Sequence, residues 1–142
     1  MHTTQALMAT LFAASAVLAA PTPTSTSIST SASTSSVTSD WVIQNLDRDC
    51  TEDQTSCTWT FSIYDGDTTT ECTYIVDGPD VSGGPTECGG YTITSNYVGD
   101  ADPAWTQMSV IKDGYLIYPD YTDAELASPP VADFTQAPQP TP

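Results

Sequence analysis

Positive charge is almost absent from this chain of 142 residues. Only two residues are lysine or arginine, Arg48 and Lys112, against 18 aspartate and glutamate residues, so the formal net charge at pH 7 is −16. A surface of this sign repels phosphate backbones and anionic lipid headgroups. The sequence therefore predicts that the protein binds neither nucleic acid nor a membrane surface.

Long hydrophobic runs are also missing. The most apolar stretch, Ala6–Leu18, is too short to span a bilayer and ends in small residues, which is typical of a secretory signal peptide. We expect residues 1–19 to be removed on export, with cleavage after Ala19. The alternative, a membrane anchor, lacks the basic flank that usually sets its orientation.

Histidine occurs once, at His2, within the predicted signal peptide. The mature chain therefore has no imidazole base, which excludes a serine or cysteine nucleophile of the triad type. The Asp-Thr-Gly and Asp-Ser-Gly signatures of aspartic proteases are missing as well. Acid–base catalysis by two carboxylates needs a particular facing pair, and the sequence selects none. We expect the protein not to be an enzyme.

Residues 20–39 contain no charged and no aromatic residue and consist largely of Ser, Thr and Pro. Such a segment cannot bury enough apolar surface to fold. In an exported protein this composition is typical of a disordered, O-glycosylated stalk. The folded domain is expected to cover residues 40–142.

Four cysteines follow the predicted signal peptide: Cys50, Cys57, Cys72 and Cys88. Export favours their oxidation in pairs, and three pairings are open. We favour Cys50 with Cys57 and Cys72 with Cys88, since each pair encloses a polar, turn-rich loop. Each would contribute about 2.5 to 3 kcal/mol in the chain-entropy model. The rival interpretation, a zinc site, lacks the usual Cys-x-x-Cys spacing.

The segment Cys57–Tyr64 alternates strictly between large apolar or cysteine residues and hydroxylic residues. A period of two predicts a strand with one face in a core and the other in water. Less regular patterns predict further strands over 41–46, 71–76, 91–98, 106–111 and 115–118. Residues 81–90 are expected to form a loop. A helical turn is expected within 121–126, followed by an extended Pro-rich tail. Short strands with turn residues between them predict an all-β fold, a compact antiparallel β-sandwich or small β-barrel stapled by two disulfides.

The order of several motifs resembles a known family. These motifs are Trp41–Cys50, Cys57–Ile63, Cys72–Tyr74, Cys88–Ser95, Met108–Val110 and Tyr118–Asp123. In this order the chain resembles the fungal secreted proteins related to the Alternaria major allergen. Within that group it is similar to the hypersensitive-response-inducing elicitors, and the similarity extends from Trp41 to Asp133.

The resemblance implies a compact β fold with two intramolecular disulfides. It also implies a secreted, extracellular effector, elicitor or allergen-like protein that binds host proteins without catalysis. Two stretches depart from the family: Gly99–Trp105 replaces a glycine- and phenylalanine-rich loop, and Ser128–Pro130 replaces a segment with glycine. If these loops contact the partner, the partner differs. The alternative function is a non-catalytic cell-wall glycan-binding or structural cell-surface protein.

Two sets of residues are candidates for sites. Asp65 and Asp67, on a predicted turn, could supply oxygen ligands to calcium, although loop aspartates also cap turns. No other cofactor is expected. Trp105, with Asp100 and Asp102 in the preceding acidic loop, is the candidate for a partner contact. The alternative is that Trp105 folds back onto the core.

Overall fold

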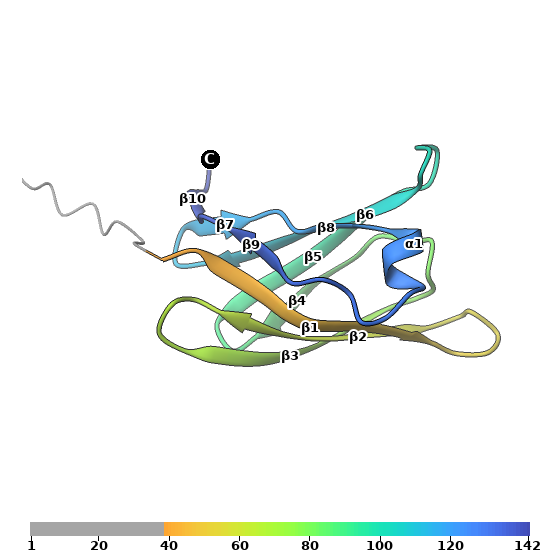
Figure 1. Cartoon of the computed structure of the whole chain (residues 1–142), viewed down its shortest axis with the longest axis horizontal. Helices are drawn as coiled ribbons and strands as arrows, with labels where there is room; N and C mark the ends of the chain where they lie inside the picture. Colours follow the sequence, from red (N-terminus) through yellow and green to blue (C-terminus); the bar gives the residue numbers. More distant parts are fainter. Residues whose placement is uncertain (1–38) are drawn as a thin grey trace, which may run out of the picture. The chain divides into compact units, whose positions relative to one another are not determined.

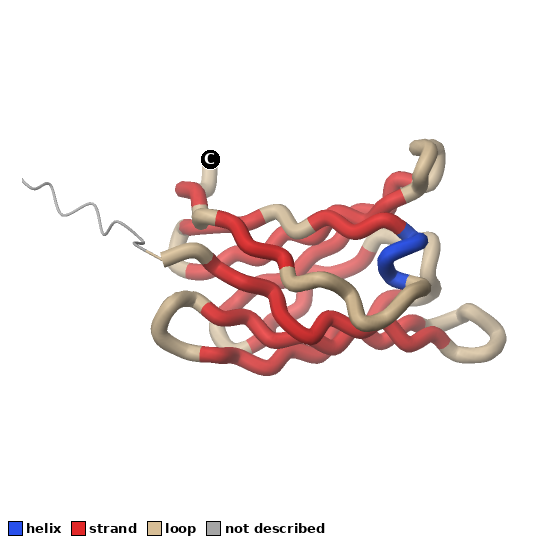
Figure 2. The backbone as a smooth tube through the Cα atoms, in the orientation of Figure 1, coloured by secondary structure: helices blue, strands red, loops and turns tan. Residues whose placement is uncertain are grey.

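Two antiparallel sheets packed face to face make up residues 39–142, the part of the chain that the computed structural model describes (Figures 1 and 2). The predicted signal peptide, 1–19, and all but the last residue of the predicted stalk, 20–39, lie outside these residues. The strands do not close into a barrel, so the prediction of an all-β sandwich is confirmed and the barrel alternative is not.

The first sheet, sheet A, has the strand order β3-β2-β1-β9. Its strands are β1 (Trp41–Cys50), β2 (Cys57–Tyr64), β3 (Thr69–Val76) and β9 (Phe134–Gln136). Sheet B has the order β10-β7-β6-β5-β4, and β8 pairs with β6 beside this path. Its strands are β4 (Gly83–Cys88), β5 (Tyr91–Val98), β6 (Trp105–Lys112), β7 (Tyr115–Ile117), β8 (Asp120–Thr122) and β10 (Gln139–Pro140). One short helix, α1 (Asp123–Leu126), follows β8.

The strand β2 has the bounds and the buried face that its alternation predicts. Its core residues Cys57, Trp59, Phe61 and Ile63 are all at most 2% exposed. They face apolar residues of β5 and β6 in sheet B, namely Tyr91, Ile93, Met108 and Val110. The core therefore lies between the sheets, which leaves the outer face of each sheet for contacts with other molecules.

Both disulfides have the pairing that we favoured from the sequence. Cys50–Cys57 closes the hairpin of β1 and β2 within sheet A. Cys72–Cys88 joins β3 to β4, and these are edge strands of sheets A and B. This second bond ties one open side of the sandwich together.

The two cations of the chain form ion pairs at opposite ends of the sandwich. At one end, Lys112 Nζ of β6 lies 3.1 Å from Asp65 Oδ2, in the turn after β2. At the other end, Arg48 Nη1 of β1 lies 3.9 Å from Asp123 Oδ1, at the start of α1. Among residues 39–142 these are the only ion pairs: Lys112 joins sheet B to a turn of sheet A, and Arg48 joins sheet A to α1.

Two segments differ from the sequence-based expectation. Residues 81–90, expected to be a loop, contain β4, whose register against β5 shifts between Gly83 and Thr86. The expected Pro-rich tail is extended, but β9 pairs with β1 and β10 pairs with β7. The expected helical turn is α1, which begins with a capping box between Thr122 and Glu125. None of the helices in residues 39–142 is long and apolar enough to cross a membrane.

Candidate functional site

Asp65, one of the two calcium candidates, is the centre of a hydrogen-bond network. Its carboxylate accepts hydrogen bonds from Lys112 Nζ at 3.1 Å, from the Tyr91 hydroxyl at 3.0 Å and from the backbone N–H of Thr68 at 2.8 Å. Asp67 is exposed, and its backbone N–H donates to Asp65 Oδ1. Within residues 39–142 no three side chains that could ligate a metal gather. This geometry gives Asp65 a structural role and adds no support for calcium.

The charge of Asp65 makes the stability of the fold sensitive to acid. Burial alone would raise the pKa of Asp65, but the Thr68 backbone hydrogen bond and the Lys112 ammonium outweigh it and hold the pKa well below its usual range. A carboxylate with a lowered pKa in the folded state contributes stability that is fully present above its unfolded pKa of about 3.9. That contribution is lost as the pH falls from there through the folded pKa.

We therefore expect Asp65→Asn to lower the free energy of unfolding by about 1.5 kcal/mol at pH 7, since it removes an ion pair and charge-assisted hydrogen bonds. The difference from the wild type should shrink as the pH falls from 5 to 3. Urea unfolding at each pH measures both effects. Asp67→Asn is the matched control, because its exposed carboxylate makes no such contacts, and it should change little. An unchanged difference between pH 5 and pH 3 would contradict the assignment.

Trp105, the candidate for a partner contact, lies on the outer face of sheet B. In the register of β6 with β8, Trp105 is opposite Thr122 and Gln107 is opposite Asp120. Thr106 and Tyr121, which lie between these pairs, are buried on the inner face. Because side chains alternate along a strand, the two pairs lie on the outer face: Trp105, Gln107, Asp120 and Thr122. Trp105 itself is partly buried. It therefore belongs to the surface of the sheet and not to the core.

The loop before β6 completes a pocket around Trp105, which we call the Trp105 pocket. It has a volume of about 530 Å³ and is lined by Ala101, Asp102, Pro103, Trp105, Gln107, Asp120 and Thr122. The end of the loop is fixed to α1, because the Asp123 N–H donates to the Ala104 carbonyl at 3.1 Å. Of the predicted contact residues, Trp105 and Asp102 line this pocket and Asp100 does not.

The sequence did not point to Asp120, Gln107 and Thr122 as members of this site. They reach it through the pairing of β8 with β6, a contact between distant segments that no local pattern reveals. Two signals were indirect: Tyr118–Asp123 is one of the motifs that carry the family resemblance, and Asp120 with Asp123 is one of several pairs of carboxylates on predicted loops. The pocket thus combines residues of the loop 99–105, which departs from the family resemblance, with residues of the motif Tyr118–Asp123, which carries it.

The Trp105 pocket is negatively charged, and no cation of the described chain compensates it. Arg48 pairs with Asp123 and Lys112 with Asp65, so within residues 39–142 neither Asp102 nor Asp120 has a cationic partner. Burial raises the pKa of the neighbouring Tyr121 phenol, and the charges of Asp120, Asp133 and Glu125 add to the shift. A ligand that covers this pocket therefore has to provide positive charge or hydrogen-bond donors.

A second depression continues the Trp105 pocket across sheet B. It has a volume of about 210 Å³ and is lined by Thr94, Ser95, Asn96, Gln107, Met108, Ser109 and Tyr118. Gln107 lines both pockets, and Tyr118 is 40% exposed. We call the two together the outer groove of sheet B. It has an aromatic side chain near each end.

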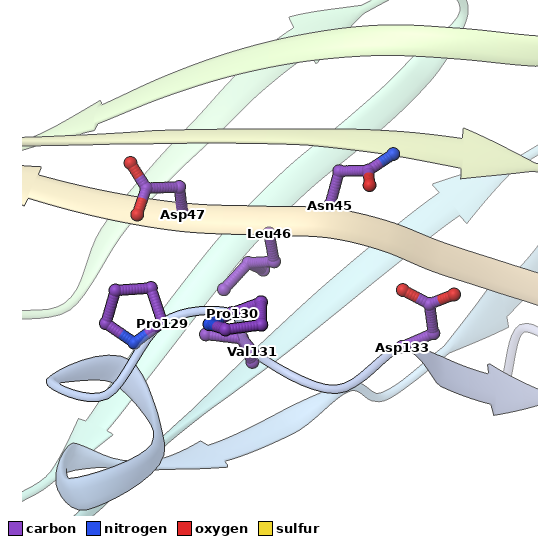
Figure 3. A pocket seen from close by; sticks show the side chains of 7 residues that line it. All are labelled: Asn45, Leu46, Asp47, Pro129, Pro130, Val131 and Asp133. Carbon is purple, nitrogen blue, oxygen red and sulfur yellow. The ribbon is translucent and has the colours of Figure 1, made fainter.

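A further pocket lies beside β1, where β9 no longer accompanies that strand (Figure 3). Its volume is about 460 Å³, and its lining residues are Asn45, Leu46, Asp47, Pro129, Pro130, Val131 and Asp133. The Leu46 side chain points towards Pro130 and Val131, whereas Asn45 and Asp47 point away from them (Figure 3). Both segments that depart from the family resemblance, 99–105 and 128–130, thus contribute to surface pockets.

Comparison with known proteins gives two concordant matches. A family model described as Effector TSP1 matches residues 42–141, nearly all of the described sandwich. The chain is also similar to a protein named Effector TSP1 from Hypocrea virens, strain Gv29-8, with 38% identity over an alignment of 146 residues. That alignment covers 96% of this chain and 95% of the relative.

Proposed function

Because the chain belongs to the Effector TSP1 family, we propose that it is a secreted effector that binds a host protein without catalysing a reaction. Two disulfides are consistent with export, as they form and persist in oxidising compartments. Binding would take place through the Trp105 pocket.

The observation that carries this proposal is the position of Trp105. Residues that dominate binding energy at protein interfaces are often tryptophans set among groups that exclude water. Trp105 stands on a central strand of sheet B, and the pairing of β6 with β8 holds its neighbours Gln107, Asp120 and Thr122 in place. A partly buried ring on a rigid sheet loses little conformational entropy when a partner covers it.

A non-catalytic mode is supported by the composition of the described residues. Residues 39–142 contain no histidine, so no serine or threonine hydroxyl has an imidazole base beside it. The carboxylates of the Trp105 pocket face a surface that is open to solvent, and Asp102 and Asp120 are both exposed. General acid catalysis by a carboxyl group usually depends on a site that shields it from water.

The resemblance to the hypersensitive-response-inducing elicitors suggests the readout for a test. Purified protein infiltrated into leaf tissue should cause necrosis or an oxidative burst, and Trp105→Ala should reduce that response at equal dose. Trp105→Phe keeps an aromatic ring and should retain part of the response. A full response from a correctly folded Trp105→Ala protein would exclude the Trp105 pocket as the contact, and no response from the wild type would argue against an elicitor.

A further inference from the structure

The outer groove of sheet B has an aromatic ring at each end. Along β6 the outward side chains are Trp105, Gln107 and Ser109, and Tyr118 lies beside Ser109. Four residues of extended strand separate Trp105 from Ser109, a distance of about 13 Å. An occupant that uses both rings must therefore be elongated and must present an apolar face at two places. A chain of sugar rings does so, since the C–H faces of sugars pack on aromatic rings.

Uncharged hydrogen-bonding groups lie between the two rings. The Gln107 amide lines both pockets, and the exposed Asn96 accepts a hydrogen bond from Ser82 Oγ at its carbonyl oxygen at 3.3 Å. The hydroxyls of Thr94 and Ser109 bond to each other and still carry free lone pairs. Amides and hydroxyls of this kind pair with the hydroxyls of a sugar.

The Trp105 end of the groove adds a requirement for positive charge. Asp102 and Asp120 flank the ring there, and both cations of the described chain are committed elsewhere. A neutral glycan that covered these carboxylates would remove water from them without supplying a counter-charge, which costs free energy. An ammonium group would form charge-assisted hydrogen bonds with them instead.

From these three features together we infer that the outer groove of sheet B binds a glycan that carries free amino groups, an oligomer of amino sugars. A basic peptide would satisfy the two carboxylates but not the two spaced rings, and a neutral glycan would satisfy the rings but not the carboxylates. An amino-sugar oligomer uses both sets of groups. The inference goes beyond recognition of a host protein; both ligands would use Trp105, and titration with purified oligomers tests the glycan by itself.

Isothermal titration of the full chain with three hexameric probes tests the inference: β-1,4-linked glucosamine, the same hexamer fully N-acetylated, and hexalysine. We expect the glucosamine hexamer to bind the wild type at least about tenfold more tightly than either other probe, a tenfold ratio being worth about 1.4 kcal/mol. Asp102→Asn with Asp120→Asn should weaken that binding about tenfold or more, since each substitution removes one charge-assisted pair. Trp105→Ala should weaken it as well, and Trp105→Phe should restore part of the affinity.

The matched control is Glu52→Gln with Asp67→Asn, which removes the same charge from exposed positions outside the groove. It should retain the wild-type affinity within about twofold, because exposed distant charges are largely screened by salt. Equal affinity for the acetylated hexamer would overturn the inference in favour of a neutral glycan. If hexalysine bound as tightly as the glucosamine hexamer, the net charge of the protein would explain the binding and the inference would be wrong. The same conclusion would follow if the control variant lost as much affinity as the variant with Asp102→Asn and Asp120→Asn. Absence of binding by the glucosamine hexamer to the wild type would also overturn the inference.

Discussion

Replacing Cys72 and Cys88 together by alanine is expected to lower the free energy of unfolding by about 3 kcal/mol, the value of the chain-entropy model for a loop of this length. The two cysteines are 16 residues apart and connect β3 of sheet A to β4 of sheet B. Without the bond, the short connection over residues 77–82 and noncovalent contacts still join these two edges, but the unfolded chain gains the freedom of an open loop. Guanidinium unfolding without reductant, followed by tryptophan fluorescence, measures the change.

The comparison variant replaces Cys50 and Cys57 by alanine. These residues are only 7 apart and lie on adjacent strands of one hairpin, so the expected loss is smaller, about 2.5 kcal/mol. The hairpin also keeps its backbone hydrogen bonds when the sulfurs are removed. A larger loss in this variant than in the Cys72 and Cys88 variant would contradict the role given to the bond between the sheets.

Arg48→Ala is expected to cost about 2 kcal/mol of stability, because it removes a buried guanidinium together with its ion pair to Asp123, whose side chain is 36% exposed and therefore partly screened by water. The Arg48 side chain is only 10% exposed, and its guanidinium carbon lies 5.5 Å from the centre of the Trp59 ring. Arg48 Nη1 also donates a hydrogen bond to the Pro79 carbonyl oxygen at 3.4 Å. The substitution therefore removes packing on an aromatic ring together with a charge.

The partner carboxylate explains why the charge matters at this position. Asp123 Oδ1 is buried without a hydrogen-bond donor within residues 39–142, whereas Asp123 Oδ2 accepts a bond from the Tyr97 hydroxyl at 3.2 Å. Combining Arg48→Ala with Asp123→Asn should cost less than the sum of the two single substitutions. Urea unfolding of the four proteins completes this cycle, and strict additivity would show that the pair does not interact.

The sequence predicts those parts of the fold that depend on neighbouring residues. The strand β2 follows from the alternation in Cys57–Tyr64, and the disulfide pairing follows from the loops that each pair encloses. The strand β4 was not predicted, because Gly83-Gly84-Pro85 has the composition of a turn. Its pairing with β5 has a register shift between Gly83 and Thr86, and this tertiary pairing overrides the local preference.

The candidate site depends on contacts between distant segments, and so less of it could be predicted. Trp105 and Asp102 were identified because an aromatic residue in an acidic loop is unusual. Asp120 was not, since its place opposite Gln107 exists only after β8 pairs with β6. The role of Asp65 was likewise hidden, because Lys112 follows it by 47 residues. A local pattern can suggest a carboxylate, but it cannot show which cation reaches it.

The pairing of β1 with β9 also bears on how the protein matures. Trp41 in β1 is opposite Gln136 in β9, so the two paired strands are far apart in the sequence. Sheet A therefore cannot be completed until residue 136 has left the ribosome. Folds dominated by contacts of such long sequence separation form slowly, and their unpaired edges are exposed in the meantime. We expect the addition of β9 to sheet A, rather than formation of the β1–β2 hairpin, to limit the rate of folding.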